Sequence, residues 1–384
     1  MNLSGIFVNI YLWKAGHSVI DVAWYNMYYA MTIPIMCVAA GWIIKHKGAI
    51  ISFRTGIIIE VFFYMLLLYL KADSIRYLCL IGCLKGTSAA FFAMGMHTMT
   101  YDFSKRDEYP LIFSYTSIFS NISALTAPLI TGFVLMIISS QTGYNVIFSC
   151  SLILYVVSVI FTSKIQNNKQ ASSYKILEVF KKKNKARTLI NTAYGLSSMK
   201  NITFSFLISL LLYIQTDSEL SVGLFSSLAG ISSIFIIYVV GRRINEGNRN
   251  RILPLCAFAV LLSVAGLIFK ISIPSILFYI VLSSMFEPLI GIIQNIMCFE
   301  VIKSDPDCEN LRVEYIIVRE FPIAAGRIIG LLVFIVFKDV LNNLMLLKVV
   351  IFLLGSVFVW MWLIMRKVNS DRIGKSRTPN STYL

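Results

Sequence analysis

Charged residues are scarce in this sequence, and their scarcity excludes most classes of protein. They make up 14% of the 384 residues, whereas a typical soluble domain has about 25%. Hydrophobic residues make up 57%, and the mean hydropathy is +0.76. A soluble globule of this composition would expose large apolar patches, and a disordered chain would be far less apolar. An integral membrane protein is the class that remains.

Signatures of catalysis and of tightly bound groups are also missing. The sequence has no phosphate-binding P-loop, no H-E-x-x-H and no G-x-S-x-G motif, and its seven cysteines lack zinc-site spacing. We therefore expect no enzyme activity, no cofactor and no metal. The net charge of +15 would suggest nucleic acid in a soluble protein. Membrane proteins instead collect basic residues in their cytoplasmic loops, so we expect no nucleic-acid partner.

Long apolar segments are abundant, and they have the length of membrane-spanning helices. Such a helix needs roughly 20 mostly apolar residues, and these segments do not alternate as transmembrane strands do. The first candidate has only 11 residues, so it is either a truncated helix, which we favour, or the end of a helix that starts upstream. The twelve candidates are 3–13, 22–44, 55–70, 75–99, 110–138, 144–163, 188–214, 222–241, 252–271, 274–302, 311–337 and 344–365.

Basic residues fall in alternate loops between these segments. With both termini in the cytoplasm, the cytoplasmic loops and tail hold 24 of the 34 Lys and Arg residues, and the outer loops hold five. This asymmetry is the positive-inside pattern. It predicts a multi-pass protein of the cytoplasmic membrane. We interpret the charge of the longest loop, 164–187, as topological anchoring rather than as a site for acidic lipids.

The two halves of the chain resemble each other at an offset of 198 residues. The matching positions are 99–102 with 297–300, Ala127 with Ala325, and Gly132 with Gly330. An all-α membrane protein with two parallel six-helix repeats is therefore expected. The predicted division is a bundle at 1–163, a basic linker at 164–187, a bundle at 188–365 and a basic cytoplasmic tail at 366–384.

These features resemble the major facilitator superfamily over essentially the whole chain. The family loop G-x-x-x-D-R-x-G-R-R matches 41–50, which keeps Gly41 and Gly48 but has Lys45 in place of the aspartate. The exporter signature G-x8-G-x3-G-P-x2-G-G is loosely matched on the fifth segment, where Pro128 and Gly132 are kept. The resemblance implies gating or hinge roles for these residues. Ordinary close packing of small residues is the alternative for the fifth segment.

Ionisable residues inside the predicted spans are costly, at about 2.5 kcal/mol or more each, and normally face a cavity or a partner. The resemblance places the helices that carry six of them around a central cavity. Two interpretations stay open: a pathway for protons or substrate, with Glu287 and Glu320 as carriers, or a static network that joins Glu287 to Arg319. The six residues are Lys85, Lys200, Glu287, Arg319, Glu320 and Arg327.

Other residues in the spans are predicted to support such a pathway. Tyr28 and Tyr29 lie deep enough in the second segment to contact an aromatic or cationic substrate. Pro288 and Pro322 lie beside the charges and should break helical hydrogen bonds there, which would provide hinges. Glu60 falls on a packing helix, so we interpret it as structural.

We therefore expect a secondary active transporter that moves a small molecule across the cytoplasmic membrane by alternating access. The resemblance favours a proton-coupled exporter, driven by protons or another ion and acting as a monomer in the lipid bilayer. The alternative is a transporter-shaped scaffold or receptor that does not transport. The altered loop around Lys45 and the short first helix would fit that alternative.

Overall fold

The computed structural model describes residues 2–16, 18–103, 108–138, 140–162, 174–182, 184–336 and 344–376. All regular structure within these ranges is helical. The elements are α1 (Asn2–Gly16), α2 (Val19–Lys47), α3 (Ala49–Leu70), η1 (Lys71–Tyr77), α4 (Leu78–Phe103), α5 (Tyr109–Ile137), α6 (Ser140–Thr162), α7 (Ile176–Lys181), α8 (Lys185–Thr216), α9 (Glu219–Val239), η3 (Gly241–Arg243), α10 (Arg249–Phe269), α11 (Ile273–Lys303), α12 (Cys308–Val336) and α13 (Leu344–Ser376).

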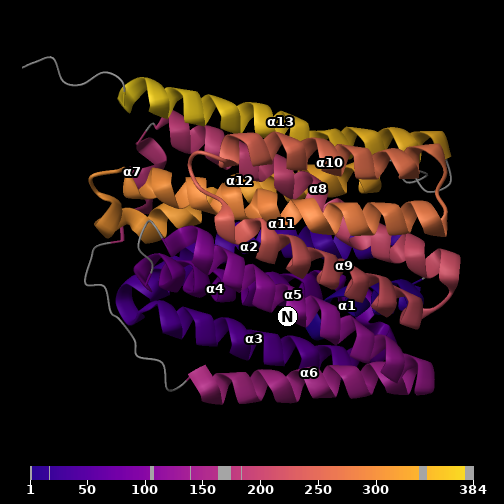
Figure 1. The fold of residues 1–384 in the computed structure, drawn as a ribbon. Coiled ribbons are helices and arrows are strands. Elements are labelled where there is room, and N and C mark those ends of the chain that lie inside the picture. Colours follow the sequence, from indigo (N-terminus) through magenta and orange to yellow (C-terminus); the bar gives the residue numbers. More distant parts are fainter. Residues whose placement is uncertain are drawn as a thin grey trace, which may run out of the picture.

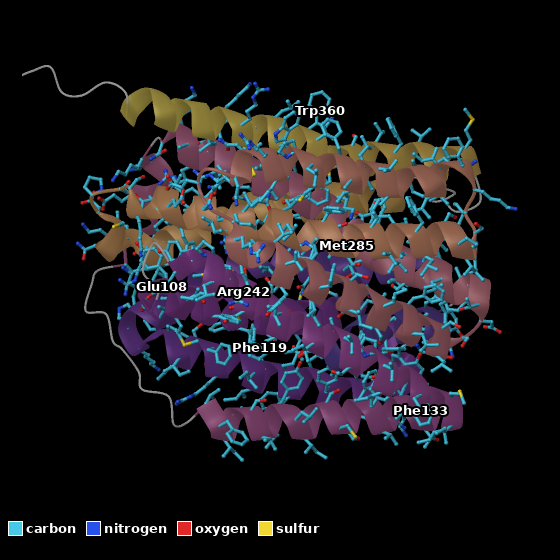
Figure 2. All side chains as sticks on the ribbon, in the orientation of Figure 1. Glu108, Phe119, Phe133, Arg242, Met285 and Trp360 are labelled. Atoms are coloured by element: carbon cyan, nitrogen blue, oxygen red, sulfur yellow. The ribbon has the colours of Figure 1, made fainter. Side chains whose placement is uncertain are left out.

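Ten of these helices are long and apolar enough to cross a membrane. Two further helices, the short α1 and the long α12, bring the number to twelve in the described ranges, in agreement with the predicted fold class. With 15 residues, α1 is short. By contrast, α12 is as long as its neighbours but contains Arg319, Glu320 and Arg327. Large apolar side chains such as Phe119, Phe133 and Trp360 cover the outside of the bundle (Figure 2), as a surface in contact with lipid requires.

The two halves pack their helices in the same pattern. In the first half α4 contacts α2 and α3, α6 contacts α3, and α5 contacts α1. The corresponding contacts of the second half are α11 with α9 and α10, α13 with α10, and α12 with α8. The halves meet where α5 lies along α9 and α12 lies along α2, and α6 and α13 lie at opposite edges of the bundle (Figure 1).

The linker and the end of the last helix differ from the prediction. The linker, predicted as a loop, contains α7, and its boundary at 163–164 lies outside the described residues. The last helix does not end at residue 365, because α13 continues to Ser376. The residues after Met365 contain no proline before residue 376 and no glycine before Gly374, so nothing local ends the helix there. Residues 377–384 of the predicted tail lie outside the described ranges.

Close contact between the halves depends on the small residues of α5 and α9. A Cβ on Gly223 would lie 2.6 Å from the carbonyl oxygen of Pro128, and a Cβ on Gly132 would lie 2.9 Å from that of Glu219. Small residues allow two helix backbones to approach in lipid. The face of α5 around Pro128 and Gly132 is therefore a packing surface against the other half. Gly48 separates α2 from α3 at a φ of 99°, which a side chain rarely adopts.

Candidate functional site

A cavity of about 380 Å³ is lined mainly by α8, α9 and α11 of the second half, and α5 of the first half forms the rest of its wall. This volume lies in the range of small-molecule sites. Most of the wall is apolar. The cavity extends from Glu287 towards Leu212 and Val222, which lie near the end of α8 and the start of α9. Its polar lining groups include Asn121, Asn201, Ser226, Ser233 and Ser284.

Lys200 of α8 and Glu287 of α11 form an ion pair in the cavity wall. The Lys200 side chain is 1% exposed and that of Glu287 is 25% exposed. The ammonium lies 4.8 Å from the ring centroid of Phe204 and 5.1 Å from that of Tyr279, and these rings partly compensate for lost water. The carboxylate is therefore the charged group of the pair that faces the cavity.

The expected pair between Glu287 and Arg319 does not form. The Arg319 guanidinium donates instead to its neighbour Glu320 at 3.1 Å and lies 5.1 Å from the ring centroid of Tyr194. The helix that carries Glu287, α11, packs more extensively against α8 than against α12, so Glu287 meets a residue of α8. Matched depth in the membrane could not reveal this neighbour. Within the described residues, Nε and Nη1 of Arg319 have no hydrogen-bond partner.

Lys85 lies outside the cavity, in a second buried pair. It contacts Glu60 of α3 inside the first half, with the Phe63 ring centroid 4.9 Å from its ammonium. Glu60 is completely buried, which agrees with a structural role for that residue. Arg327 is half-buried on α12, two turns beyond Glu320.

The predicted aromatic and hinge residues are divided between the cavity and the helix contacts. Pro288 lines the cavity beside Glu287, whereas neither Tyr28 nor Tyr29 is among its described lining residues. The Tyr28 ring stacks on Trp24, with 5.8 Å between the ring centroids. Pro322 packs through its carbonyl oxygen against α8, where a Cβ on Gly195 would lie 2.8 Å away. Among the described residues, no cluster of three or more His, Cys, Asp or Glu could hold a metal ion.

One end of the bundle, which we call the linker end because α7 lies there, is closed by ion pairs across the halves. Lys45 of α2 lies 3.2 Å from Glu314 of α12, with both side chains 0% exposed. Arg312 of α12 lies 2.8 Å from Asp102 of α4. The ring of Phe299 on α11 packs edge-on against three rings of the first half, those of Tyr101, Tyr109 and Phe113. At the opposite end, Lys14 of α1 pairs with Glu219 of α9.

The Lys45–Glu314 pair explains the altered loop noted in the sequence. Lys45 occupies the position where the family motif has an aspartate, and its partner carries the opposite charge. Sequence reasoning identified Lys45 as a departure but did not find Glu314, because its partner lies 269 positions further along the chain.

The linker is attached to this closed end. Lys182 donates to Asp305 at 2.6 Å and to Asp307 at 3.1 Å, and the hydroxyl of Tyr315 donates to Asp305 at 2.7 Å. Burial alone would raise the pKa of Asp305, but hydrogen bonds from Lys182 and Tyr315 outweigh it and hold that pKa below its ordinary value. The hydrogen bond with Asp305 raises the pKa of Lys182. The pair therefore stays charged at neutral pH.

Residues 1–305 match the family model of the Major Facilitator Superfamily. The chain belongs to this superfamily. Among curated proteins, this superfamily member is 28% identical over 343 residues to the uncharacterized protein YqgE of Bacillus subtilis (strain 168), a match that covers 89% of the chain and 80% of the relative.

Solved structures of transporters share the fold. A bacterial homologue of the iron transporter ferroportin, crystallised in an outward-facing state, aligns with a TM-score of 0.67 at 13% identity, over 96% of this chain and 100% of that one. The human organic anion transporter MFSD10 aligns with a TM-score of 0.62 at 10% identity, over 89% of this chain and 83% of the other. Family and fold together identify a multi-pass membrane protein that functions in the transport of a small molecule.

Proposed function

We propose that this protein is a proton-coupled secondary transporter that exports a small amphipathic molecule by alternating access. It acts as a monomer in the cytoplasmic membrane, with both termini in the cytoplasm. The bundles 1–163 and 188–365 move against each other about the central cavity, and the hinge residues beside the cavity include Pro288. The linker end is then the cytoplasmic end, and the structure corresponds to a state closed on that side.

The observation that carries this proposal is the unequal exposure of the Lys200–Glu287 pair. The ammonium is held beneath aromatic rings, whereas the carboxylate is 25% exposed in the cavity wall. A proton or a cationic group of the substrate can therefore reach Glu287 and compete with Lys200 for it. Such competition is the basis of exchange between a proton and a substrate at one carboxylate.

Closure of the linker end supports the alternating-access part of the proposal. Its two ion pairs and the Phe299 ring cluster all join the first half to the second. The cavity, by contrast, extends away from this end towards Leu212 and Val222. Breaking the Lys45–Glu314 and Asp102–Arg312 pairs would open the cavity towards the linker end.

The proposal can be tested without knowing the substrate. Spin labels at His46 on α2 and Ser304 beyond α11 report the separation of the halves at the linker end, because both positions are exposed there. We expect two distance populations whose ratio changes when the pH is lowered. In Glu287→Gln, and in the charge-balanced Lys200→Met/Glu287→Gln, the ratio should no longer depend on pH.

Glu320→Gln is the matched control, since Glu320 is the second carboxylate in the predicted pathway and pairs within its own helix. A pH response lost in Glu320→Gln and retained in Glu287→Gln would move the coupling site to Glu320. A single distance that ignores pH in every variant would favour the non-transporting scaffold instead.

A further inference from the structure

A second cavity, of about 400 Å³, lies at the linker end between α5, η3, α10 and α11. It shares none of its lining residues with the first cavity, which contains Lys200 and Glu287. Three arginines line it: Arg242 and Arg243 from η3, and Arg249 from the first turn of α10. One wall, at Pro110 and Leu111, comes from α5 of the first half, so the cavity spans the boundary between the halves.

The residues that line this cavity carry a net positive charge. Arg249 is 7% exposed and donates twice to Glu300, at 3.1 and 2.9 Å, while its Nε has no hydrogen-bond partner among the described residues. Arg242 and Arg243 are exposed, and the Arg242 guanidinium lies against aromatic rings. Glu246 is the second acid in the lining, so three guanidinium groups face two carboxylates.

The arginines lie at the end of an apolar face formed by α5 and α9. The Arg242 guanidinium lies 5.6 Å from the ring centroid of Tyr115 on α5 and 5.2 Å from that of Tyr238 on α9. Phe119 on α5 and Phe235 on α9 continue this face away from the linker end, and all four aromatic side chains are exposed. Arg242 and Phe119 can be located in Figure 2.

We propose that this cavity binds the phosphate headgroup of an anionic phospholipid, whose acyl chains lie along the exposed face of α5 and α9. A guanidinium binds phosphate with two parallel hydrogen bonds, and basic pockets between helix ends recognise acidic headgroups. A free anion would use the arginines but not the apolar face. Since the walls belong to both halves, a bound lipid stabilises the state in which the linker end is closed.

This inference does not depend on proton coupling or on the substrate, and its test uses neither. The full-length chain is purified in detergent and titrated with dioleoyl phosphatidylglycerol or dioleoyl phosphatidylcholine. The readouts are the thermal midpoint and the lipid retained in native mass spectrometry. We expect phosphatidylglycerol to raise the midpoint and to remain bound, whereas phosphatidylcholine does neither at the same mole fraction.

Arg242→Gln/Arg243→Gln should weaken phosphatidylglycerol binding roughly tenfold or more, since each basic residue near a headgroup contributes substantially. Arg251→Gln is the matched control, because Arg251 is an exposed arginine of the same helix start but does not line the cavity. It should bind phosphatidylglycerol as the wild type does. Glycerol phosphate and inorganic phosphate at millimolar concentration should leave the midpoint unchanged.

Four results would overturn the proposal. Equal weakening in Arg251→Gln would mean general attraction to a basic surface, and unchanged binding in the double variant would place the lipid elsewhere. Stabilisation by inorganic phosphate equal to that by phosphatidylglycerol would indicate a soluble anion. If the double glutamine variant does not fold, Arg242→Lys/Arg243→Lys keeps the charge and should bind more weakly than wild type, because lysine lacks the two-pronged donor. Wild-type affinity in that variant would also contradict the site.

Discussion

The buried ammonium of Lys200 needs a carboxylate beside it, and Glu287 provides one. Its ammonium is removed from water by Phe204, Tyr279 and the surrounding helices, and Glu287 is the carboxylate that balances it. Removing one partner of a buried pair costs about 3–5 kcal/mol, because the other charge is then stranded. The two partners are unequal, however, since the Glu287 side chain is 25% exposed and that of Lys200 is only 1% exposed.

This inequality predicts an asymmetric response to mutation. Glu287→Gln should lower the free energy of unfolding by roughly 3 kcal/mol, and Lys200→Met should cost less because the remaining carboxylate is partly hydrated. The double variant should recover most of the loss. Thermal midpoints in detergent, combined as a double-mutant cycle, measure the coupling.

Glu287→Gln combined with Arg319→Gln provides the control for that cycle. The two residues do not form a pair, and Arg319 instead contacts Glu320. Their effects should therefore add. Strong coupling between Glu287 and Arg319, with none between Glu287 and Lys200, would contradict the arrangement of α8 and α11 described above.

At the scale of the elements, glycines decide how closely helices approach. Gly326 of α12 faces Gly195 of α8 so closely that a Cβ on Gly326 would overlap the carbonyl oxygen of Gly195. That oxygen belongs to the backbone and cannot rotate away. By contrast, a Cβ on Gly291 of α11 would meet no heavy atom within 4 Å.

These two glycines make a matched pair of alanine substitutions. Gly326→Ala should force α8 and α12 apart and destabilise the protein by about 1–3 kcal/mol or more. Gly291→Ala should lie within about 1 kcal/mol of wild type, on the stabilising side, because alanine favours the helix over glycine. Thermal midpoints and recovery from gel filtration check both. Equal loss in both variants would mean that backbone flexibility, not close contact, is the role of Gly326.

At the scale of the whole molecule, the two halves are held together at the linker end by charges of opposite sign on α2 and α12. Lys45 and Glu314 are both completely buried, and the backbone N–H of Lys175 in the linker also donates to Glu314 at 3.1 Å. The hydroxyl of Tyr174 donates to the carbonyl oxygen of Val38 on α2 at 2.9 Å. The linker therefore contacts both sides of the closed end.

Reversing one charge of this pair should open the linker end. Lys45→Glu would place two buried carboxylates together, and the spin-label distance between His46 and Ser304 should shift to the longer population. Lys45→Glu/Glu314→Lys should restore the shorter distance in part. The recovery is incomplete because the Lys45 ammonium also donates to the carbonyl oxygen of Asn310, and a carboxylate at position 45 has no proton to donate to that oxygen.

Two results would count against this role of the pair. A wild-type distance in Lys45→Glu would show that Lys45 does not hold the halves together. A double variant as open as the single one would show that Glu314 is not the residue that Lys45 contacts.

The twelve helices and their division into two similar sets were predictable from the sequence alone. Apolar length, scarce charge and alternating basic loops are properties of the chain that the bilayer requires of any spanning helix, whatever its neighbours. Sequence also identified Lys200 and Glu287 as unusual, because the cost of burying a charge in lipid does not depend on the partner.

Only the tertiary structure decided which residues meet. Their positions along α11 and α12 place Glu287 and Arg319 at similar depths in the membrane. Each helix has several neighbours, however, and packing decides which face of a helix contacts which neighbour. Glu287 therefore pairs with Lys200 of α8, and Lys45 with Glu314 across the halves. The arginines of η3, which count only as topology signals in the sequence, line a cavity because α5 of the first half packs beside them. These contacts join positions far apart in the chain, and the order of residues within any one segment does not specify them.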